Sequence, residues 1–206
     1  MYRSQCGQDR YVSKTLFPSL AEGFYVDVGA NDGETHSNTY HFEKRRGWNG
    51  ICIEPHPDAF SILESKRECI KYNCAIDTQE KVVDFYCNTG HTEQLSGLLD
   101  YYHPKHLSRK DLEIAEHGGD SSLIKVQARP LSDILRECSI SHIDYLSVDV
   151  EGAELAVMKS IDFDEVSITC IDFENNYDTT DVEDYLIQKG YEVKARIKWD
   201  TIMIKS

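Results

Sequence analysis

Phe24-Tyr-Val-Asp27-Val-Gly29-Ala-Asn-Asp-Gly33 joins an apolar run, typical of a buried β-strand, to a turn of small residues. Gly29 and Gly33 carry no Cβ, so the backbone can turn sharply here and approach a ligand closely. In open parallel sheets, ligands bind beyond the carboxyl ends of the strands. The stretch therefore predicts a cofactor loop with Asp27 at the end of the first strand. A strand-to-helix turn without a ligand is the alternative.

The glycine spacing of this loop narrows the class of cofactor. The pattern Asp-x-Gly-x-x-x-Gly is neither the Gly-x-Gly-x-x-Gly of dinucleotide enzymes nor a triphosphate loop. A nicotinamide oxidoreductase, which shares the layered sheet, is therefore disfavoured. An acid at the loop suits a cofactor with a cationic amino-acid end, and S-adenosylmethionine (SAM) is the common one.

A second acid follows the next apolar run, where Gly50-Ile-Cys-Ile53 ends in Glu54-Pro55. This is about twenty residues after the loop, the place where a βαβ unit puts the acid that binds ribose hydroxyls. A carboxylate can accept two hydrogen bonds from a vicinal diol. An exposed acid at a strand end is the alternative interpretation.

Strand and helix signals alternate along the chain and predict a doubly wound, Rossmann-like α/β fold. The sheet is expected to be mostly parallel and to close with an antiparallel C-terminal pair. Without repeats or linkers, residues 1–206 are predicted to form a single domain. Strands are expected at 24–28, 50–53, 70–76, 82–87, 123–128, 145–148, 167–173, 191–197 and 201–204, and helices at 8–17, 37–46, 58–66, 131–137, 153–159 and 180–189.

Residues 88–122 are polar and rich in histidine, and they do not fit the alternation of strands and helices. Long irregular segments in compact domains are often functional, so a lid or substrate loop is expected. A short helix near 107–116 is the alternative. His103 and His106 have a spacing that would permit a metal site, but solvated loop histidines are the favoured interpretation.

The composition excludes some partners. The chain has 22 basic and 36 acidic residues and a net charge of -14, which opposes phosphate backbones and anionic membranes, so a nucleic acid partner is not expected. No run approaches the roughly 18 apolar residues of a membrane span. The first twenty residues contain charges rather than a secretory core. The seven scattered cysteines contain no Cys-x-x-Cys and indicate free thiols in a reducing, cytoplasmic compartment.

With these motifs in place, the chain resembles FkbM-type SAM-dependent methyltransferases. The blocks that carry the resemblance keep their order over most of the chain. They are Ser4-Gln5-x-Gly7-Gln8-Asp9, residues 26–33, Ser37-Asn38-Thr39, Gly47-Trp48-x-Gly50-x-x-Ile53-Glu54-Pro55, residues 73–76 and residues 144–154.

The resemblance implies a SAM site whose parts can be assigned to segments. The loop surrounds the methionine end, Ser37 and Asn38 support it, Glu54 holds the ribose, and the stretch after residue 72 borders the adenine. Gln5 and Gln8 fold over the cofactor, or simply begin a helix. The expected cofactor-binding residues are Gln5, Asp27, Gly29, Ala30, Asn31, Gly33, Ser37, Asn38, Glu54, Pro55, Asn73, Ala75 and Asp149.

Two acidic clusters, Asp149-Val-Glu151 and Asp172-Phe-Glu174-Asn175, end strands expected beside the cofactor. An alcohol is a poor nucleophile at neutral pH, so a carboxylate must take its proton or a divalent cation must lower its pKa. Glu151 and Asp149 are the expected catalytic acids. Glu151, Glu174 and Asn175 are the expected ligands of Mg²⁺ or Mn²⁺. Alternatively, Asp149 and Glu151 cap the following helix, or Asp149 contacts the cofactor.

The resulting hypothesis is a SAM-dependent O-methyltransferase acting on a hydroxyl of a sugar or glycan, alone or as part of a larger glycan-modifying enzyme. A non-sugar natural product is the alternative acceptor, and a catalytically silent binding module is the alternative class. An amino-group methyltransferase of DNA is disfavoured by the charge. It is also disfavoured because Asp149-Val-Glu-Gly152 stands where an Asn/Asp-Pro-Pro-Tyr/Phe segment would be expected.

Overall fold

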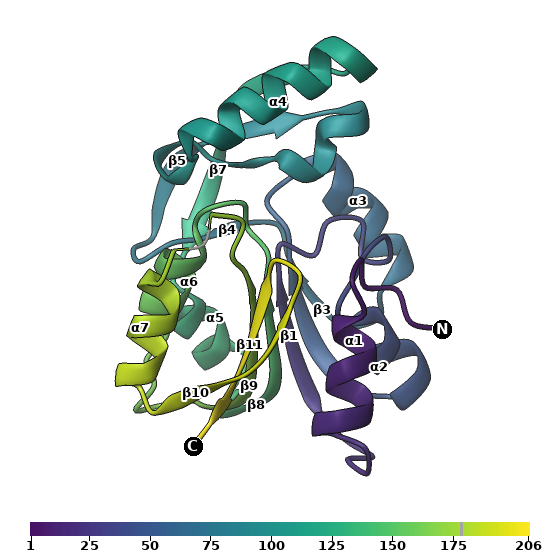
Figure 1. The fold of residues 1–206 in the computed structure, drawn as a ribbon, viewed down its shortest axis with the longest axis vertical. Coiled ribbons are helices and arrows are strands. Elements are labelled where there is room, and N and C mark those ends of the chain that lie inside the picture. The colour runs from purple at the N-terminus through teal and green to yellow at the C-terminus, as the bar shows by residue number, and fades with distance from the viewer. Residues whose placement is uncertain (178) are drawn as a thin grey trace.

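A seven-stranded sheet forms the centre of the protein, in the order β10-β11-β9-β8-β1-β2-β3 (Figure 1). The computed structural model describes residues 1–177 and 179–206. The strands are β1 (Phe24–Val28), β2 (Asn49–Ile53), β3 (Ile70–Tyr72), β8 (His142–Val148), β9 (Ser167–Glu174), β10 (Tyr191–Ile197) and β11 (Asp200–Lys205).

The sheet is mixed. Strands β3, β2, β1, β8 and β9 pair in parallel, whereas β11 pairs antiparallel with both β9 and β10. The doubly wound α/β class and the antiparallel C-terminal pair are confirmed, whereas the sheet is mixed rather than mostly parallel because β11 reverses direction between β9 and β10. The antiparallel β11 lies between β9 and β10, so its first residue is beside the last residue of β9.

Helices cover both faces of this sheet (Figure 1). One face carries α1 (Gln8–Tyr11), which continues as a π-helical turn (Val12–Leu16), α2 (Tyr40–Arg46) and α3 (Pro57–Lys66). The other carries α5 (Leu131–Glu137), α6 (Glu154–Lys159) and α7 (Asp181–Gln188). Strand β1 shows why both faces are covered, because Val26 and Val28 pack in one core while Tyr25 packs in the other.

A second sheet of four strands, in the order β4-β7-β5-β6, lies beyond the carboxyl ends of the first (Figure 1). It consists of β4 (Ala75–Ile76), β5 (Lys81–Asn88), β6 (Gly97–Leu98) and β7 (Ser121–Arg129). The prediction of one strand over 70–76 is wrong, because the chain passes between the sheets at Asn73 and Cys74. The Asn73 amide donates to the backbone oxygens of Glu54 (2.8 Å) and Pro55 (3.3 Å), which holds this passage against the end of β2.

Residues 88–122 are regular rather than a long loop. They form two 3-10 turns (Gly90–Leu95 and Leu99–Tyr101), strand β6 and helix α4 (Pro104–His117), which crosses the outside of the second sheet (Figure 1). The helix considered near 107–116 is therefore present and longer. Among the described residues, no helix is long and apolar enough to cross a membrane. All seven cysteines are free thiols.

Candidate active site

A cavity of about 410 Å³ opens at the carboxyl ends of β1, β2, β8 and β9, below the second sheet. Its volume is within the usual range of small-molecule sites, about 300 to 1,000 Å³. The cavity brings together most of the expected site residues. Those that border it are Gln5, Gln8, Asp27, Gly29, Ala30, Asn31, Ser37, Asn38, Glu54, Pro55, Ala75, Asp149, Glu151 and Glu174. The residues Gly33, Asn73 and Asn175 lie outside this lining.

The turn after β1 is fixed between two neighbouring strands. The amides of Gly29 and Ala30 both donate to the carbonyl oxygen of Ile53, at 2.9 and 3.1 Å. Gly29 has φ +87°, and a Cβ placed on it would stand 1.7 Å from the carbonyl oxygen of Asp149. Only glycine permits this approach of two backbones. Glycine at position 29 therefore lets the turn after β1 meet the backbone at the end of β8 beside the cavity.

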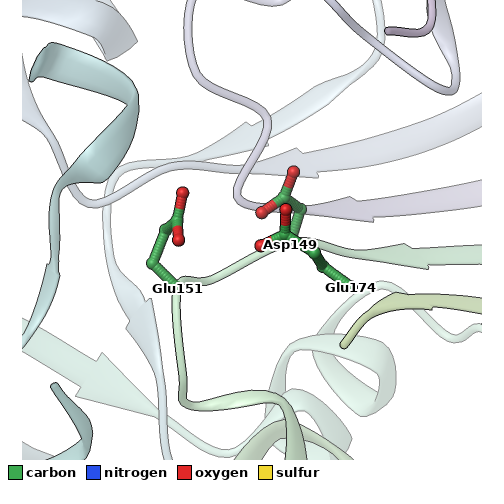
Figure 2. Close-up of side chains that lie close together, drawn as sticks. All are labelled: Asp149, Glu151 and Glu174. Carbon is green, nitrogen blue, oxygen red and sulfur yellow. The ribbon is translucent and has the colours of Figure 1, made fainter. Parts of the chain in front are cut away.

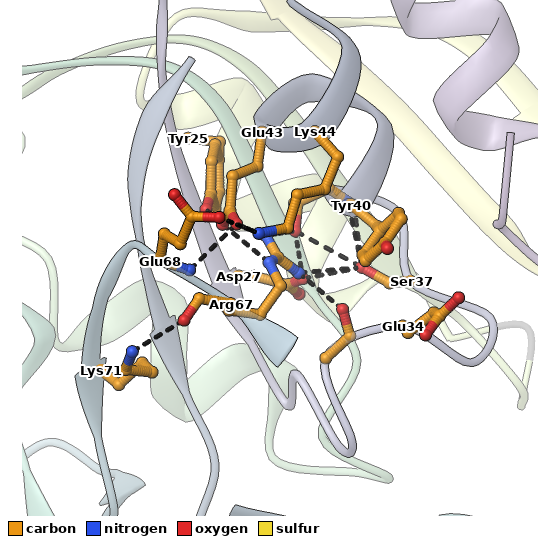
Figure 3. Close-up of polar contacts among 12 residues, drawn as sticks. Tyr25, Asp27, Glu34, Ser37, Tyr40, Glu43, Lys44, Arg67, Glu68 and Lys71 are labelled. Atoms are coloured by element: carbon orange, nitrogen blue, oxygen red, sulfur yellow. Dashed lines mark hydrogen bonds and ion pairs between the residues drawn. The ribbon is translucent and has the colours of Figure 1, made fainter. Parts of the chain in front are cut away.

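Asp27 is buried beneath the turn and belongs to a polar network around Arg67 (Figure 3). Its carboxylate accepts hydrogen bonds from Thr39 (2.5 Å) and Ser37 (3.4 Å). Burial raises the pKa of Asp27, and the Arg67 guanidinium lowers it. These hydroxyls already use part of the hydrogen-bonding capacity of the carboxylate, so its first role here is to hold the loop.

Arg67 is the centre of that network, and its side chain is fully buried. It donates to the carbonyl oxygen of Gly33 (2.9 Å), to Thr39 Oγ1 (3.0 Å) and to Glu43 Oε2 (2.8 Å) (Figure 3). A Cβ on Gly33 would stand 2.8 Å from Arg67 Cγ. The missing side chain of Gly33 thus makes room for Arg67 rather than for a ligand.

Glu54 is buried at the end of β2, where two backbone amides fix its carboxylate. Oε1 accepts from the amide of His56 and Oε2 from the amide of Asn31, both at 2.7 Å. Burial raises the pKa of Glu54 to about 7, and the two amides oppose that shift. The carboxylate is therefore held at the cavity with free lone pairs and is not the exposed acid of the alternative interpretation. The wall beside it is mainly apolar and is formed by Cys74, Ala75, Ile76 and Phe85.

Three carboxylates converge on the other side of the cavity, those of Asp149, Glu151 and Glu174 (Figure 2). One oxygen from each lies within 4.8 Å of the others. Glu151 has φ +58°, a conformation that is strained for a residue with a side chain, and residues strained in this way cluster at functional sites. Two parallel strands, β8 and β9, end side by side and deliver these acids to one point.

The amide in this cluster is Asn176 rather than the expected Asn175. Asn176 Nδ2 donates to Glu174 Oε2 (2.5 Å) and to Glu151 Oε2 (3.5 Å). Asn175 instead binds the backbone of Thr179, as donor at 2.8 Å and as acceptor at 3.1 Å. It borders a second, neighbouring cavity. The side chain of Asn175 is therefore used to close the loop after β9.

The N-cap of α6, Ala153, makes no side-chain cap hydrogen bond, so neither Asp149 nor Glu151 caps the helix, and the segment before it is held by Glu154. Its Oε1 accepts from the amides of Val150 (3.3 Å) and Gly152 (3.0 Å), just before α6. Asp149 and Glu151 are therefore available to a ligand.

Mutual repulsion and burial raise the pKa values of the acidic cluster. Asp149 is exposed to the cavity, and desolvation by the surrounding protein raises its pKa to about 6. Burial and the neighbouring carboxylates raise the pKa values of Glu151 and Glu174. Arg109 of α4 borders the same cavity and lowers the pKa of Glu151. A cation bound between these carboxylates would release their protons.

His106 of α4 is buried, 1% exposed, with Nδ1 3.4 Å from Glu151 Oε2. Burial lowers its pKa, so the ring is neutral near pH 7. The interpretation of this residue as a solvated loop histidine is wrong, because 104–117 is a helix packed on the second sheet. His103 stacks on Tyr177, with ring centroids 4.1 Å apart.

Several residues at the cavity could not be found from sequence motifs: His36, Arg109, Asn176, Trp199 and Asp200. His36 Nδ1 lies 3.2 Å from Gln94 Oε1, a contact between the loop after β1 and the insert. Residues 93–98 of the insert border the cavity. The insert thus forms a wall of the site.

A parallel core sheet with a glycine turn after β1, an acid after β2 and a cavity at the carboxyl edge is the architecture of class I SAM-dependent methyltransferases. Residues 27–193 match the model of the methyltransferase FkbM domain, and the chain belongs to that family. The crystal structure of the FkbM methyltransferase from Methylobacillus flagellatus KT is similar in fold. It has a TM-score of 0.55 and 16% identity over 94% of this chain and 47% of that protein.

The N-terminal domain of human METTL16 also aligns, at a TM-score of 0.49 and 11% identity, over 95% of this chain and 67% of that one. The present chain spans about half the length of the Methylobacillus protein. No curated protein matches the sequence.

Proposed function

We propose that the chain binds SAM and transfers its methyl group to a hydroxyl of a sugar or glycan. The observation that carries the proposal is that the fixed carboxylate of Glu54 and the acidic cluster border one cavity. A cofactor held at Glu54 would meet an acceptor beside the acids.

The cavity offers the donors and acceptors that SAM requires. Glu54 would accept the two ribose hydroxyls, and the wall of Ala75 and Phe85 would contact the adenine. Asn38 donates to Ser147 Oγ (3.1 Å), while its buried Oδ1 has no hydrogen-bond partner among the described residues. An unpaired buried acceptor is costly. The ammonium group of the methionine end would satisfy it, with Gln5 and Gln8 closing over the cofactor.

Glu151 is the proposed general base. SAM, when bound, supplies an electrophilic methyl group. The acceptor hydroxyl must lose its proton during the transfer, and a carboxylate with a raised pKa is a stronger base than a solvated one. Glu151 is oriented by Asn176 and lies near His106. Holding the hydroxyl in line contributes further to the rate.

A divalent cation bound at the acidic cluster would also promote the loss of the hydroxyl proton. Asp149, Glu151 and Glu174 present the hard oxygen ligands that Mg²⁺ or Mn²⁺ takes, which fits such an ion. It would lower the pKa of a hydroxyl. Asn176 borders this cluster in place of the expected Asn175.

The same proposal includes the domain organisation of the chain and its cellular compartment. Residues 1–206 would act as a single domain in which 88–122 serve as the lid or substrate wall, alone or within a larger glycan-modifying protein. The free thiols favour a reducing, cytoplasmic compartment. The charge of -14 disfavours nucleic acid as acceptor.

A matched pair of measurements separates this proposal from its alternatives. Titration calorimetry measures SAM binding, and incubation with methyl-labelled SAM and a panel of sugars and phenols detects methylated products by mass spectrometry. We expect Glu151→Gln to bind SAM and to lose methyl transfer at least tenfold. Products only from phenols would establish the non-sugar acceptor. SAM binding without any product from the wild type would favour the silent binding module.

A further inference from the structure

The turn between β10 and β11 places an exposed tryptophan at the cavity. Strand β11 begins beside the end of β9, with Asp200 opposite Glu174 in the antiparallel register. The turn therefore reaches the edge of the sheet where the acids converge (Figure 1). The amide of Asn175 donates to the carbonyl oxygen of Trp199 (2.7 Å), which ties the turn to the segment after β9.

Trp199 differs from the other tryptophan of the chain. Trp48 is 2% exposed and packs in the core against Phe17 and Phe42, whereas Trp199 is 45% exposed and borders the cavity. A single exposed apolar side chain needs no explanation on an open surface. Beside a cavity that also contains carboxylates, it supplies a flat apolar surface, which Lys198 Nζ approaches to 5.4 Å from the ring centroid.

Asp200, the next residue, supplies the polar group. It is 5% exposed and borders the same cavity. Within residues 1–177 and 179–206, its Oδ2 has no hydrogen-bond partner. Buried polar atoms are nearly always paired, so this oxygen offers an unused position for a hydrogen bond. Burial raises the pKa of Asp200 to about 7, and a side-chain hydrogen bond with Gln8 opposes that shift.

We infer that Trp199 and Asp200 form the acceptor subsite and that the ligand is a pyranose ring. The apolar C–H face of such a ring lies flat on an indole, and its hydroxyls donate to a carboxylate. This inference rests on the proposed function and specifies how the acceptor is held. The proposed cofactor contacts come from β1, β2 and the segment around Ala75. Strand β11 lies on the other side of β8 and β9, so a ring at Trp199 would approach the cofactor beside the acidic cluster, where a hydroxyl can reach both the methyl group and Glu151.

Saturation-transfer NMR on the protein loaded with S-adenosylhomocysteine tests the inference. The probes are methyl α-glucoside, methyl α-galactoside, methyl α-mannoside and, as a flat ligand that is not a sugar, catechol. We expect at least one pyranoside to bind the wild type. We expect Trp199→Ala and Asp200→Asn to weaken it at least tenfold and Trp199→Phe to retain most of the signal. Leu112→Ala is the control, because Leu112 is 64% exposed on α4 and lies outside the cavity lining.

Calorimetry with SAM on the same variants keeps the two claims apart. We expect the SAM affinity of Trp199→Ala to stay within twofold of the wild type. A wild type that does not bind SAM overturns the proposed function. If the wild type binds SAM, three results would overturn the subsite but not the proposed function. They are the absence of pyranoside binding, binding of catechol alone, and equally tight pyranoside binding by Trp199→Ala and the wild type.

Discussion

Gly29 and Asp149 are in backbone contact, since a Cβ on residue 29 would stand 1.7 Å from the carbonyl oxygen of residue 149. This contact joins the turn after β1 to the end of β8. It brings the proposed cofactor loop next to the acidic cluster. Both halves of the site therefore depend on the absence of one side chain.

The first prediction concerns this contact. Gly29→Ala should lower the free energy of unfolding by at least about 2 kcal/mol, through the positive φ and the displaced backbone, and should weaken SAM binding at least tenfold. Gly47→Ala is the matched control, because Gly47 also has a positive φ (+68°) but has nothing within 4 Å of an added Cβ. Denaturant unfolding and calorimetry measure both. Equal losses in the two variants would contradict the role of the contact.

The second prediction concerns Arg67. Arg67→Met removes the cation that Asp27 and Glu43 face in a buried network, and breaking a buried pair costs about 3–5 kcal/mol. We expect unfolding to become easier by that amount and SAM affinity to fall because the loop loses its support. Arg136→Met, which removes only exposed ion pairs, should leave stability nearly unchanged. Unchanged stability of Arg67→Met would refute the network's role.

The third prediction concerns Glu54 as the ribose ligand. A hydrogen bond to a charged group contributes about 1.5–3 kcal/mol, so Glu54→Gln should weaken SAM about 10- to 100-fold. The pKa of Glu54 is raised to about 7 in the empty site. Its ionised form is the better acceptor, so wild-type affinity for SAM should rise between pH 6 and 8. Calorimetry at several pH values should show a flatter profile for Glu54→Gln, and parallel profiles would contradict the assignment.

The fourth prediction is the pH dependence of stability without ligand. Desolvation by the surrounding protein raises the pKa values of Glu54 and Glu154 to about 7 and that of Asp149 to about 6. A carboxyl whose pKa is higher in the folded state stabilises the fold fully below its unfolded value, roughly pH 4, and this contribution is lost as the pH rises through the folded pKa. The melting temperature of the ligand-free protein should therefore fall from pH 5.5 to pH 8.

A variant identifies the source of that fall. Glu174→Gln removes one of the crowded acids and should make the melting temperature less dependent on pH, whereas Glu22→Gln, at an exposed position, should behave as the wild type. If the melting temperature of the ligand-free protein rises towards pH 8, the prediction is wrong, because ionisation of the clustered carboxyls would then not destabilise the fold.

The fifth prediction concerns the divalent cation. Mn²⁺, followed by electron paramagnetic resonance and calorimetry, should bind the wild type and bind Glu174→Gln at least tenfold more weakly. It should also raise the melting temperature most at pH 8, where the acids would otherwise repel one another. Identical Mn²⁺ binding by Glu174→Gln and the wild type would exclude the cluster as the metal site.

Local patterns predicted the half of the site on β1 and β2. The Gly29 turn and Glu54 lie at the ends of apolar runs, and parallel strands bring such ends to one edge. Asp149, Glu151 and Glu174 were predictable for the same reason. Asn175 was predicted where the structure places Asn176. The alternation of side chains along a strand stops at the end of β9, so it no longer indicates which side chain faces the cavity.

The positions of the other residues at the site depend on packing between segments that are distant in the sequence. Trp199 and Asp200 reach the cavity only because β11 is antiparallel to β9. His106 and Arg109 reach it because α4 packs on a second sheet that the alternation of strands and helices did not reveal. Arg67, at the polar end of α3, has the sequence context of a surface residue, and only the turn at Gly33 makes room for it.

The most direct test of the account is calorimetric titration of the wild type and Glu54→Gln with SAM, with NAD as the control ligand. We predict micromolar binding of SAM by the wild type, binding at least tenfold weaker by Glu54→Gln, and no heat with NAD. A folded wild type that does not bind SAM, or that binds NAD instead, would contradict the central claim.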